Sequence, residues 1–137
     1  MKLESHVTEA IQKIQAESLE RMEKAVITVR NTTVKTLSGQ RTPDPSRIYK
    51  VPDTQRTYQA SSPGEPPATR LGDLKDSVKW TIETQGKEIT GKVGTDKEYG
   101  AVLEMGSSKI LPRPWLQKSF DESKDEVIEI FNRHMEL

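Results

Sequence analysis

Apolar side chains recur near helical spacing through the first third of the chain. No proline or glycine interrupts residues 1–38, and the apolar positions that fall near helical spacing include Leu3, Val7, Ala10, Ile11, Ile14, Leu19, Met22, Val26 and Val29. This pattern predicts one long helix over residues 3–37. Two pairs of opposite charge, Glu17–Arg21 and Glu20–Lys24, are four residues apart in the order that favours exposed ion pairs on a helix.

The length of this helix has a consequence for packing. At 1.5 Å per residue it is about 50 Å long, more than a domain of this size covers by itself. Two interpretations follow: the far half frays, or it packs on a neighbouring subunit. Because the apolar stripe continues past Ile14, the second interpretation is favoured.

Residues 78–93 show the alternation of a half-buried hairpin. Val78, Trp80 and Ile82 alternate with polar residues, Gln85-Gly86-Lys87 forms the turn, and Ile89 and Val93 continue the apolar face. Gly91 lies on that face, where it marks a bulge or leaves room for Trp80. Two strands alone are marginal in water, so a third strand or a helix must cover this face.

The remaining elements are shorter or follow the hairpin. Leu71–Ser77 has the pattern of a short helical turn, and Tyr99, Val102 and Leu103 share a helical face that Gly106 terminates, with a short strand as the alternative. Pro114 is placed as the first residue of a final helix, whose apolar side is formed by Leu116, Phe120, Val127, Phe131 and His134 or Met135. The predicted fold is α+β in a single domain of residues 1–137: a long N-terminal helix, a small antiparallel sheet with a central hairpin, and a C-terminal helix packed on the sheet.

Residues 38–68 differ from the rest of the chain in amino-acid composition. Six of the eight prolines lie in this segment, which separates the helix of residues 3–37 from the α+β core of residues 69–137. Such a long proline-rich connection is either disordered or a functional arm, and we predict an arm that is mobile in the isolated protein. Its candidate contact residues are Arg41, Arg47, Tyr49, Arg56 and Tyr58, although scattered tyrosines in a loop are more often incidental.

Composition narrows the classes of protein. The chain is 32% hydrophobic, well below the roughly 45–50% apolar content of a globular domain, so part of it stays unfolded or completes its burial against partners. With 21 basic and 21 acidic residues, the net charge is zero, which argues against bulk attraction to nucleic acid or anionic membrane. Cysteine is absent, which excludes thiolate chemistry and disulfides, and the sequence predicts a soluble chain without a signal peptide or membrane span.

The sequence contains no recognisable arrangement of catalytic residues. His6 and His134 lie near opposite ends of the chain, outside any metal-ligand spacing, and Asp73 and Asp76 suit the N-terminus of a helix. Glu104 has two interpretations, a surface glutamate on a short helix or an ion pair with Arg113 or with a neighbouring subunit. We therefore expect no enzyme activity, no cofactor and no metal.

The residue types between Val93 and Leu116 are instead typical of a contact site. Glycines punctuate a short apolar segment, and a basic loop follows that prolines stiffen. The candidate interface residues are Tyr99, Glu104, Gly106, Lys109, Pro112, Arg113, Pro114 and Trp115. For Trp115 the commoner alternative is a place in the core, at the head of the last helix.

Two blocks of sequence, residues 61–78 and 93–116, resemble a family of neck proteins of long-tailed bacteriophages. The family pattern is a P-G-E-P-P-A run leading into G-D-L-x-x-S, then V-G-T, then Y-x-x-x-L-E-x-G and R-P-W/F-L. The matching positions are Pro63–Ala68, Gly72–Ser77, Gly94-Thr95, Tyr99–Gly106 and Arg113–Leu116. Together the blocks cover about a third of the chain, in the family's order and spacing.

The resemblance implies a virion structural protein that completes the tail end and joins the tail to the DNA-filled head. It implies assembly in the host cytoplasm into a ring, hexameric in the virion, whose partners are other copies of the chain, the tail tube protein and the head connector protein. DNA would at most pass through the ring, and no membrane is involved. A head-side adaptor or stopper protein is the alternative within the same machinery. A nucleic-acid-binding module that uses the arm's arginines is disfavoured by the even charge balance.

Overall fold

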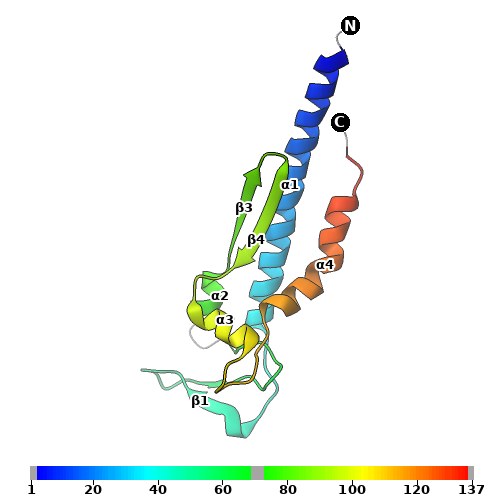
Figure 1. Cartoon of the computed structure of the whole chain (residues 1–137). Helices are drawn as coiled ribbons and strands as arrows, with labels where there is room; N and C mark the ends of the chain where they lie inside the picture. Colours follow the sequence, from blue (N-terminus) through cyan, green and yellow to red (C-terminus); the bar gives the residue numbers. More distant parts are fainter. Residues whose placement is uncertain (1–2, 69–72, 136–137) are drawn as a thin grey trace.

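The computed structural model describes residues 3–68 and 73–135 of the chain (Figure 1). In chain order the elements are α1 (Leu3–Ser38), the 3-10 helix η1 (Pro45–Arg47), β1 (Ile48–Lys50), β2 (Thr57–Gln59), α2 (Asp73–Ser77), β3 (Lys79–Gln85), β4 (Glu88–Gly94), α3 (Glu98–Met105) and α4 (Leu116–Asn132). The α+β class is confirmed. The predicted turn over Leu71–Ser77 is observed as α2 from Asp73 onward, while its first two residues lie outside the described residues.

The long helix α1 is the axis of the molecule. The β3–β4 hairpin lies along one side of it and α4 along the other, while its N-terminal turns extend beyond both (Figure 1). Its bounds match the predicted helix to within one residue. The smaller elements α2, α3 and the β1–β2 hairpin gather at the opposite end from the N-terminus (Figure 1).

The predicted hairpin is observed as β3 and β4, and α1 covers its apolar face. Trp80 pairs with Val93 and Ile82 pairs with Gly91, so these side chains share the face that packs on the helix. A Cβ atom at Gly91 would lie 2.4 Å from Val26 Cγ1 and 2.6 Å from Met22 Sδ. Gly91 therefore lets the strand approach α1 closely, which corrects the two roles expected for it, a bulge or room for Trp80.

Small hydroxyl side chains, rather than large apolar ones, form the buried face of α4. Ser119 and Ser123 are buried together with Ile130, and α1 buries Thr33. The hydroxyls of Ser123 and Thr33 donate to the carbonyls of Ser119 and Val29 at 2.9 and 2.8 Å, each four residues earlier in its own helix. Because these groups are satisfied locally, they permit close helix packing without an unpaired polar atom.

The residues predicted to form the apolar side of α4 therefore do not form its buried face. Phe120 and Phe131 are exposed, and with Leu116 and Val127 they line a groove between the elements instead of the tight contact with α1. The predicted start of the helix is also corrected, because Trp115 is the N-cap residue and Pro114 precedes it.

Arg21 joins the two long helices. Its guanidinium is buried and donates from Nη1 to the carbonyl oxygen of Phe131 at 2.9 Å and from Nε to Glu17 at 3.2 Å. A cation is favourable beside the carbonyl end of a helix. The Glu17–Arg21 pair is thus part of the α1–α4 contact, which corrects the prediction of an exposed pair, whereas Glu20–Lys24 is exposed as predicted.

The most buried cluster lies where α1, α2, β3 and α4 converge. Leu37, Leu74, Val78 and Trp115 form this cluster. Four half-buried side chains pack against it, namely Val34, Val93, Leu103 and Leu116. This cluster therefore lies at the end of the molecule where α2, α3 and the β1–β2 hairpin gather, which we call the loop end. The N-terminal turns of α1 lie far from it (Figure 1).

The proline-rich segment has more regular structure than a disordered arm. Its strands β1 and β2 pair antiparallel, and Val51, at the start of the turn between them, is buried. Asp53 in that turn has a φ of 61°. The expectation of a disordered arm is corrected in this respect, since a hairpin and a 3-10 turn occupy residues 45–59. Mobility of this hairpin in solution stays a prediction.

The close approach at Gly91 yields a stability test. We expect Gly91→Ala to lower the free energy of unfolding by about 1–3 kcal/mol, because the added methyl group displaces the hairpin from α1. The matched control is Gly94→Ala in the same strand, where no atom lies within 4 Å of the position of the added methyl. Its effect should stay within about 0.5 kcal/mol in urea unfolding. Equal effects of the two substitutions would contradict the close contact.

Candidate functional site

Trp115 is anchored in the core and makes a specific contact with α3. Its side chain is 2% exposed, and its Nε1 donates to the carbonyl oxygen of Gly100 at 2.9 Å. A Cβ atom at Gly100 would lie 3.2 Å from Trp115 Cζ2 and 2.7 Å from Thr95 Cγ2, so a side chain there would separate the two segments. The interpretation of Trp115 as a core residue is confirmed.

Glu104 closes the N-terminus of α4. Its Oε2 accepts hydrogen bonds from the backbone N–H groups of Trp115 and Leu116 at 2.8 Å each, and its Oε1 accepts from the N–H of Gln117 at 3.0 Å. A carboxylate suits this position because the first N–H groups of a helix have no intrahelical partner and carry a partial positive charge. Glu104 is therefore a helix cap contributed by another helix, which corrects the predictions of a surface glutamate and of an ion pair with Arg113. An ion pair with a neighbouring subunit stays a prediction.

Gly106 shapes the loop that leads from α3 to α4. It has a φ of +77° and donates its N–H to the carbonyl of Val102 at 2.7 Å, so it ends α3 as predicted. A Cβ atom there would lie 2.9 Å from Pro112 Cδ. The Ser107 hydroxyl oxygen then accepts from the N–H groups of Lys109 and Ile110 at 3.2 and 3.3 Å, which folds the loop into a tight turn.

Arg113 ties this loop to the proline-rich arm. Its Nε donates to Ser61 Oγ at 3.1 Å, and its Nη1 donates to the carbonyl oxygen of Leu111 at 2.9 Å. The backbone of the same loop accepts from the arm as well, because the N–H of Gly64 donates to the Pro112 carbonyl at 3.0 Å. Partial burial and the nearby charge of Arg47 lower the pKa of Arg113, while Glu65 raises it.

Arg41 fastens the two ends of the arm. Its guanidinium donates to the carbonyl oxygens of Pro66 and Pro67, both at 2.7 Å, and to that of Thr36 near the end of α1 at 2.9 Å. Burial lowers the pKa of Arg41, and the charge of Glu65 raises it. Its charge therefore satisfies carbonyl groups within the chain.

Glu65 makes the reciprocal contact with a carboxylate. It accepts from the N–H of Ser62 at 2.8 Å, and from the N–H and hydroxyl of Thr42 at 3.0 and 2.9 Å. These hydrogen bonds, that of Ser62 first, lower the pKa of Glu65 from 4.5 to about 2. The P-G-E-P-P-A run thus closes the arm onto itself.

The other predicted arm residues lie on or beside the β1–β2 hairpin. Tyr49 and Tyr58 are cross-strand partners whose ring centroids are 6.1 Å apart, so they form a pair instead of being scattered. Arg47 lies 3.6 Å from Asp44, whose pKa is lowered, chiefly by hydrogen bonds from Ser46. Arg56 is exposed in the turn.

Exposed apolar side chains lie on α3 and on the loop after it, and only Tyr99 of these was among the predicted contact residues. Met105 is 74% exposed and Leu111 is 62% exposed, and they are accompanied by Tyr99, Val102 and Ile110. We call these five residues the loop surface. Lys109 and Pro112 are exposed beside them, whereas Pro114 is half-buried. The signal in the sequence was Ile110-Leu111 within a loop, where no periodic face accounts for two aliphatic residues.

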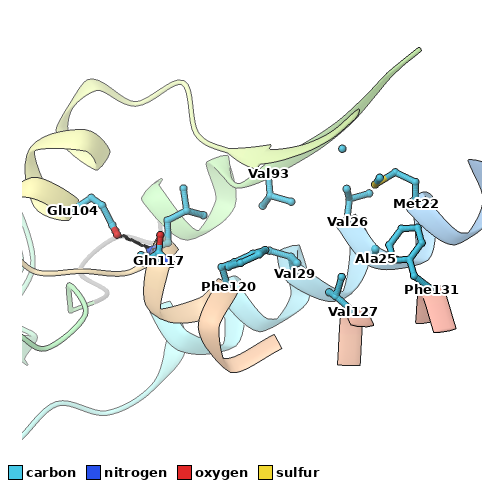
Figure 2. Close-up of a pocket in the computed structure, with 12 residues that line it drawn as sticks. Met22, Ala25, Val26, Val29, Val93, Glu104, Gln117, Phe120, Val127 and Phe131 are labelled. Carbon is cyan, nitrogen blue, oxygen red and sulfur yellow. Dashed lines mark hydrogen bonds between the residues drawn. The ribbon is translucent and has the colours of Figure 1, made fainter. Parts of the chain in front are cut away.

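No group of three or more histidine, aspartate or glutamate side chains among the described residues is arranged to hold a metal ion. A groove between α1, β4 and α4 has a volume of about 470 Å³ and an apolar lining, and its one carboxylate, Glu104, already caps α4 (Figure 2). No helix in the described part of the chain is both long and apolar enough to cross a membrane.

Comparisons with protein-family models, with curated proteins and with solved structures find no match to this chain. The residues that carry the resemblance to phage neck proteins are nevertheless connected in space. Ser77 shares a hydrogen bond with Thr95, Thr95 packs beside Gly100, and Gly100 receives the Trp115 indole. These residues therefore act together as the scaffold of the loop end.

The cap formed by Glu104 gives a direct test of this scaffold. We expect Glu104→Gln to lower the free energy of unfolding by about 1.5–3 kcal/mol, because the amide loses the charge and one of the two acceptor oxygens. Glu126→Gln, an exposed change on α4, is the matched control and should stay within about 0.5 kcal/mol. Thermal and urea unfolding measure both. Indistinguishable unfolding of the two variants would refute the cap.

The hydrogen bonds of Glu65 predict a pH dependence. Because folding lowers its pKa to about 2, its contribution to stability is complete above the usual value of 4.5 and is lost as the pH falls through about 2. Titration of the Glu65 carboxyl carbon by NMR should give a midpoint near 2, and the amide signals of Thr42 and Ser62 should follow it. In Glu65→Gln those amide signals should not follow this transition. A midpoint near 4.5 in the wild-type protein would contradict the contact.

Proposed function

We propose that this protein is a structural subunit of the neck of a long-tailed bacteriophage, which completes the tail end and joins the tail to the head. The resemblance supports the assignment, and residues from several of its blocks, Ser77, Thr95, Gly100 and Trp115, lie in contact with one another. The loop surface supports a role in protein contacts. No cluster of metal-ligating side chains among the described residues favours a different class.

The observation that carries this proposal is the exposure of large apolar side chains on a well-fixed loop. Met105 and Leu111 lie mostly in solvent, although the loop between them is held by Gly106, by the Ser107 turn and by Arg113. Rigid presentation of apolar groups lowers the entropic cost of binding a partner. This is the arrangement of a docking surface for a neighbouring subunit or for another neck protein.

The arm's arginines support this proposal over nucleic-acid binding. Arg41 donates to several backbone carbonyls and Arg113 donates to Ser61 and Leu111, so neither guanidinium is fully available for phosphate. Arg47 lies beside Asp44. An electrostatic site for a phosphate backbone requires unpaired cations on one face, and the chain has zero net charge.

The proposal predicts an assembly defect without a folding defect. The double substitution Met105→Ser, Leu111→Ser should unfold at the same temperature as the wild-type protein, because both side chains are exposed. It should weaken the contact of the loop surface with its partner by about 2 kcal/mol or more. The assay is complementation of a deletion of the gene in the encoding phage. Electron microscopy should then show filled heads and separate tails in place of joined particles, with a matching loss of plaques.

The control for this experiment is Ile128→Ser, which also replaces an exposed apolar side chain but lies on α4. It should complement fully. If the deletion itself leaves infectious particles at normal titre, the neck assignment is wrong. If only the double variant complements normally, the neck assignment stands and the loop surface is not its contact.

A further inference from the structure

One edge of the β3–β4 hairpin has no partner strand. Within the described residues, β3 pairs with β4 and with no other strand. β3 lies on the side of the hairpin that is away from α4 (Figure 1). The free edge of a strand presents a row of backbone N–H and C=O groups, which is a template for the addition of a further strand.

The turn of the hairpin determines which backbone groups lie at this edge. The pair Gln85–Glu88 closes the two-residue turn, and the register continues from it without a bulge. The pair that closes such a turn exchanges hydrogen bonds, and hydrogen-bonded pairs then alternate along antiparallel strands. The odd-numbered residues of β3 therefore bond to β4, whereas Trp80, Ile82 and Thr84 direct their N–H and C=O groups to the free edge.

β3 lacks several features that usually protect a free edge. It is seven residues long, contains no proline or glycine, and has no bulge. It does carry two exposed charges, Lys79 and Glu83, on the face turned away from α1. Because these charges have opposite signs, they repel a second strand in some registers and attract it in others.

The side chains of β3 are self-complementary in one register. When two β3 strands pair antiparallel with Thr81 at the centre, Lys79 lies opposite Glu83 of the second copy, and Trp80 lies opposite Ile82. Two-fold symmetry makes each pair occur twice. A centre at Lys79 or Glu83 would place like charges opposite each other, and a centre at Trp80 or Ile82 would leave both charges opposite uncharged residues. Thr81 is thus the one centre among residues 79–83 that matches the charges.

The same register satisfies the backbone. Trp80 and Ile82 both direct their backbone groups outward, so they form the hydrogen-bonded pairs between the two copies. Lys79 and Glu83 fall in the pairs without hydrogen bonds, where side chains are closest. Glu83 already lies 3.1 Å from Lys92 of its own hairpin, so the second copy's Lys79 extends this exposed ion pair to three charges.

A hollow between α1 and β3 lies along the free edge. Its lining residues are Ile27, Arg30 and Asn31 of α1 and residues 78–81. Trp80 lines this hollow and is 37% exposed, although it is on the face of the hairpin that packs on α1. The helix makes its close approach over β4 instead, at Gly91. The monomer therefore leaves one side of the indole open to solvent, next to the unpaired edge.

We propose that two copies of this chain pair through the free edges of β3, antiparallel about a two-fold axis at Thr81, and form a four-stranded sheet in the order β4–β3–β3–β4. Both α1 helices then cover the same face of this sheet. Because each α1 lies over β4, the helices are about three strand spacings, or roughly 14 Å, apart. Packed helices are about 8–10 Å apart, so the space between these two accommodates large side chains, and both Trp80 rings lie there.

The edge of β3 suits a second copy better than the edge of β4 does. Glu88 and Lys92 of β4 have a similar spacing, but β4 and α4 are walls of one groove, so a second hairpin with its own helix would overlap α4. An unrelated strand can use the same backbone groups, whereas the two-fold match of Lys79 with Glu83 is a property of β3 itself. The inference goes beyond the proposed neck function and does not rest on it.

The first test is a charge exchange in the purified full chain. Sedimentation equilibrium should show a reversible dimer, and Lys79→Glu should raise its dissociation constant about tenfold or more, because like charges then lie opposite each other twice. The double variant Lys79→Glu, Glu83→Lys should return to within about threefold of the wild type, because it restores both pairs. Lys87→Glu, the same change in the exposed turn, is the matched control and should dimerise as the wild type does. Circular dichroism should show all variants folded.

The second test measures the backbone directly by amide hydrogen exchange. Protection of the amides of Trp80 and Ile82 should rise with protein concentration, because their N–H groups bond only in the dimer. The amides of Thr81 and Glu83 should be protected at every concentration, because β4 already pairs with them.

The third test exploits the absence of cysteine from the chain. Under mild oxidation, Thr81→Cys should form a disulfide-linked dimer, because the two Cα atoms of a pair without hydrogen bonds are about 4.5 Å apart. Thr90→Cys, which is exposed on the same face of the hairpin but on β4, should remain monomeric on a non-reducing gel.

Three results would overturn the proposal. One is a wild-type chain that stays monomeric at all concentrations, or whose β3 edge pairs only with a different protein. Another is a double charge variant that dissociates as readily as Lys79→Glu alone. The third is cross-linking of Thr81→Cys no stronger than that of Thr90→Cys, since this would place the contact elsewhere. None of these results bears on phage complementation, so the two proposals fail separately.

Discussion

The cap that Glu104 places on α4 is the constraint on which the loop end depends. One carboxylate fixes three consecutive backbone N–H groups and thereby sets where α4 begins relative to α3. That position brings the Trp115 indole onto Gly100 and holds both ends of the loop that presents Met105 and Leu111. The cap joins Glu104 of α3 to the N-terminus of α4 across the intervening loop, so it fixes the two helices relative to each other.

Different interactions stabilise the two ends of the molecule. At the loop end, apolar burial around Trp115 is reinforced by hydrogen bonds to the backbone. Arg113 and Arg41 donate to carbonyl oxygens, while Glu104 and Glu65 accept from N–H groups. Along α1, the contact with α4 uses small hydroxyl residues and leaves large apolar side chains in an open groove. The most buried apolar cluster thus lies around Trp115, while several large apolar side chains of α1 and α4 are exposed.

Several residues that the sequence marked as contact candidates turn out to hold the contact surface in place. Trp115 is core, Glu104 is a cap, and Arg113 links the loop to the arm. Apolar residues beside them, Met105 and Leu111, carry the exposure instead. Residue types that are typical of contact sites can therefore hold a surface loop in place instead of being exposed on it.

The sequence by itself determined the elements whose periodicity is local. The long helix α1, the β3–β4 hairpin and the end of α3 at Gly106 follow from spacing and turn chemistry, which act over a few residues. Only the tertiary structure decided which face of α4 is buried, why Gly91 is a glycine, and what Glu104, Arg21 and Arg41 bind. Those contacts join residues that are distant in the chain, and their geometry depends on how closely whole elements approach one another, which no local pattern encodes.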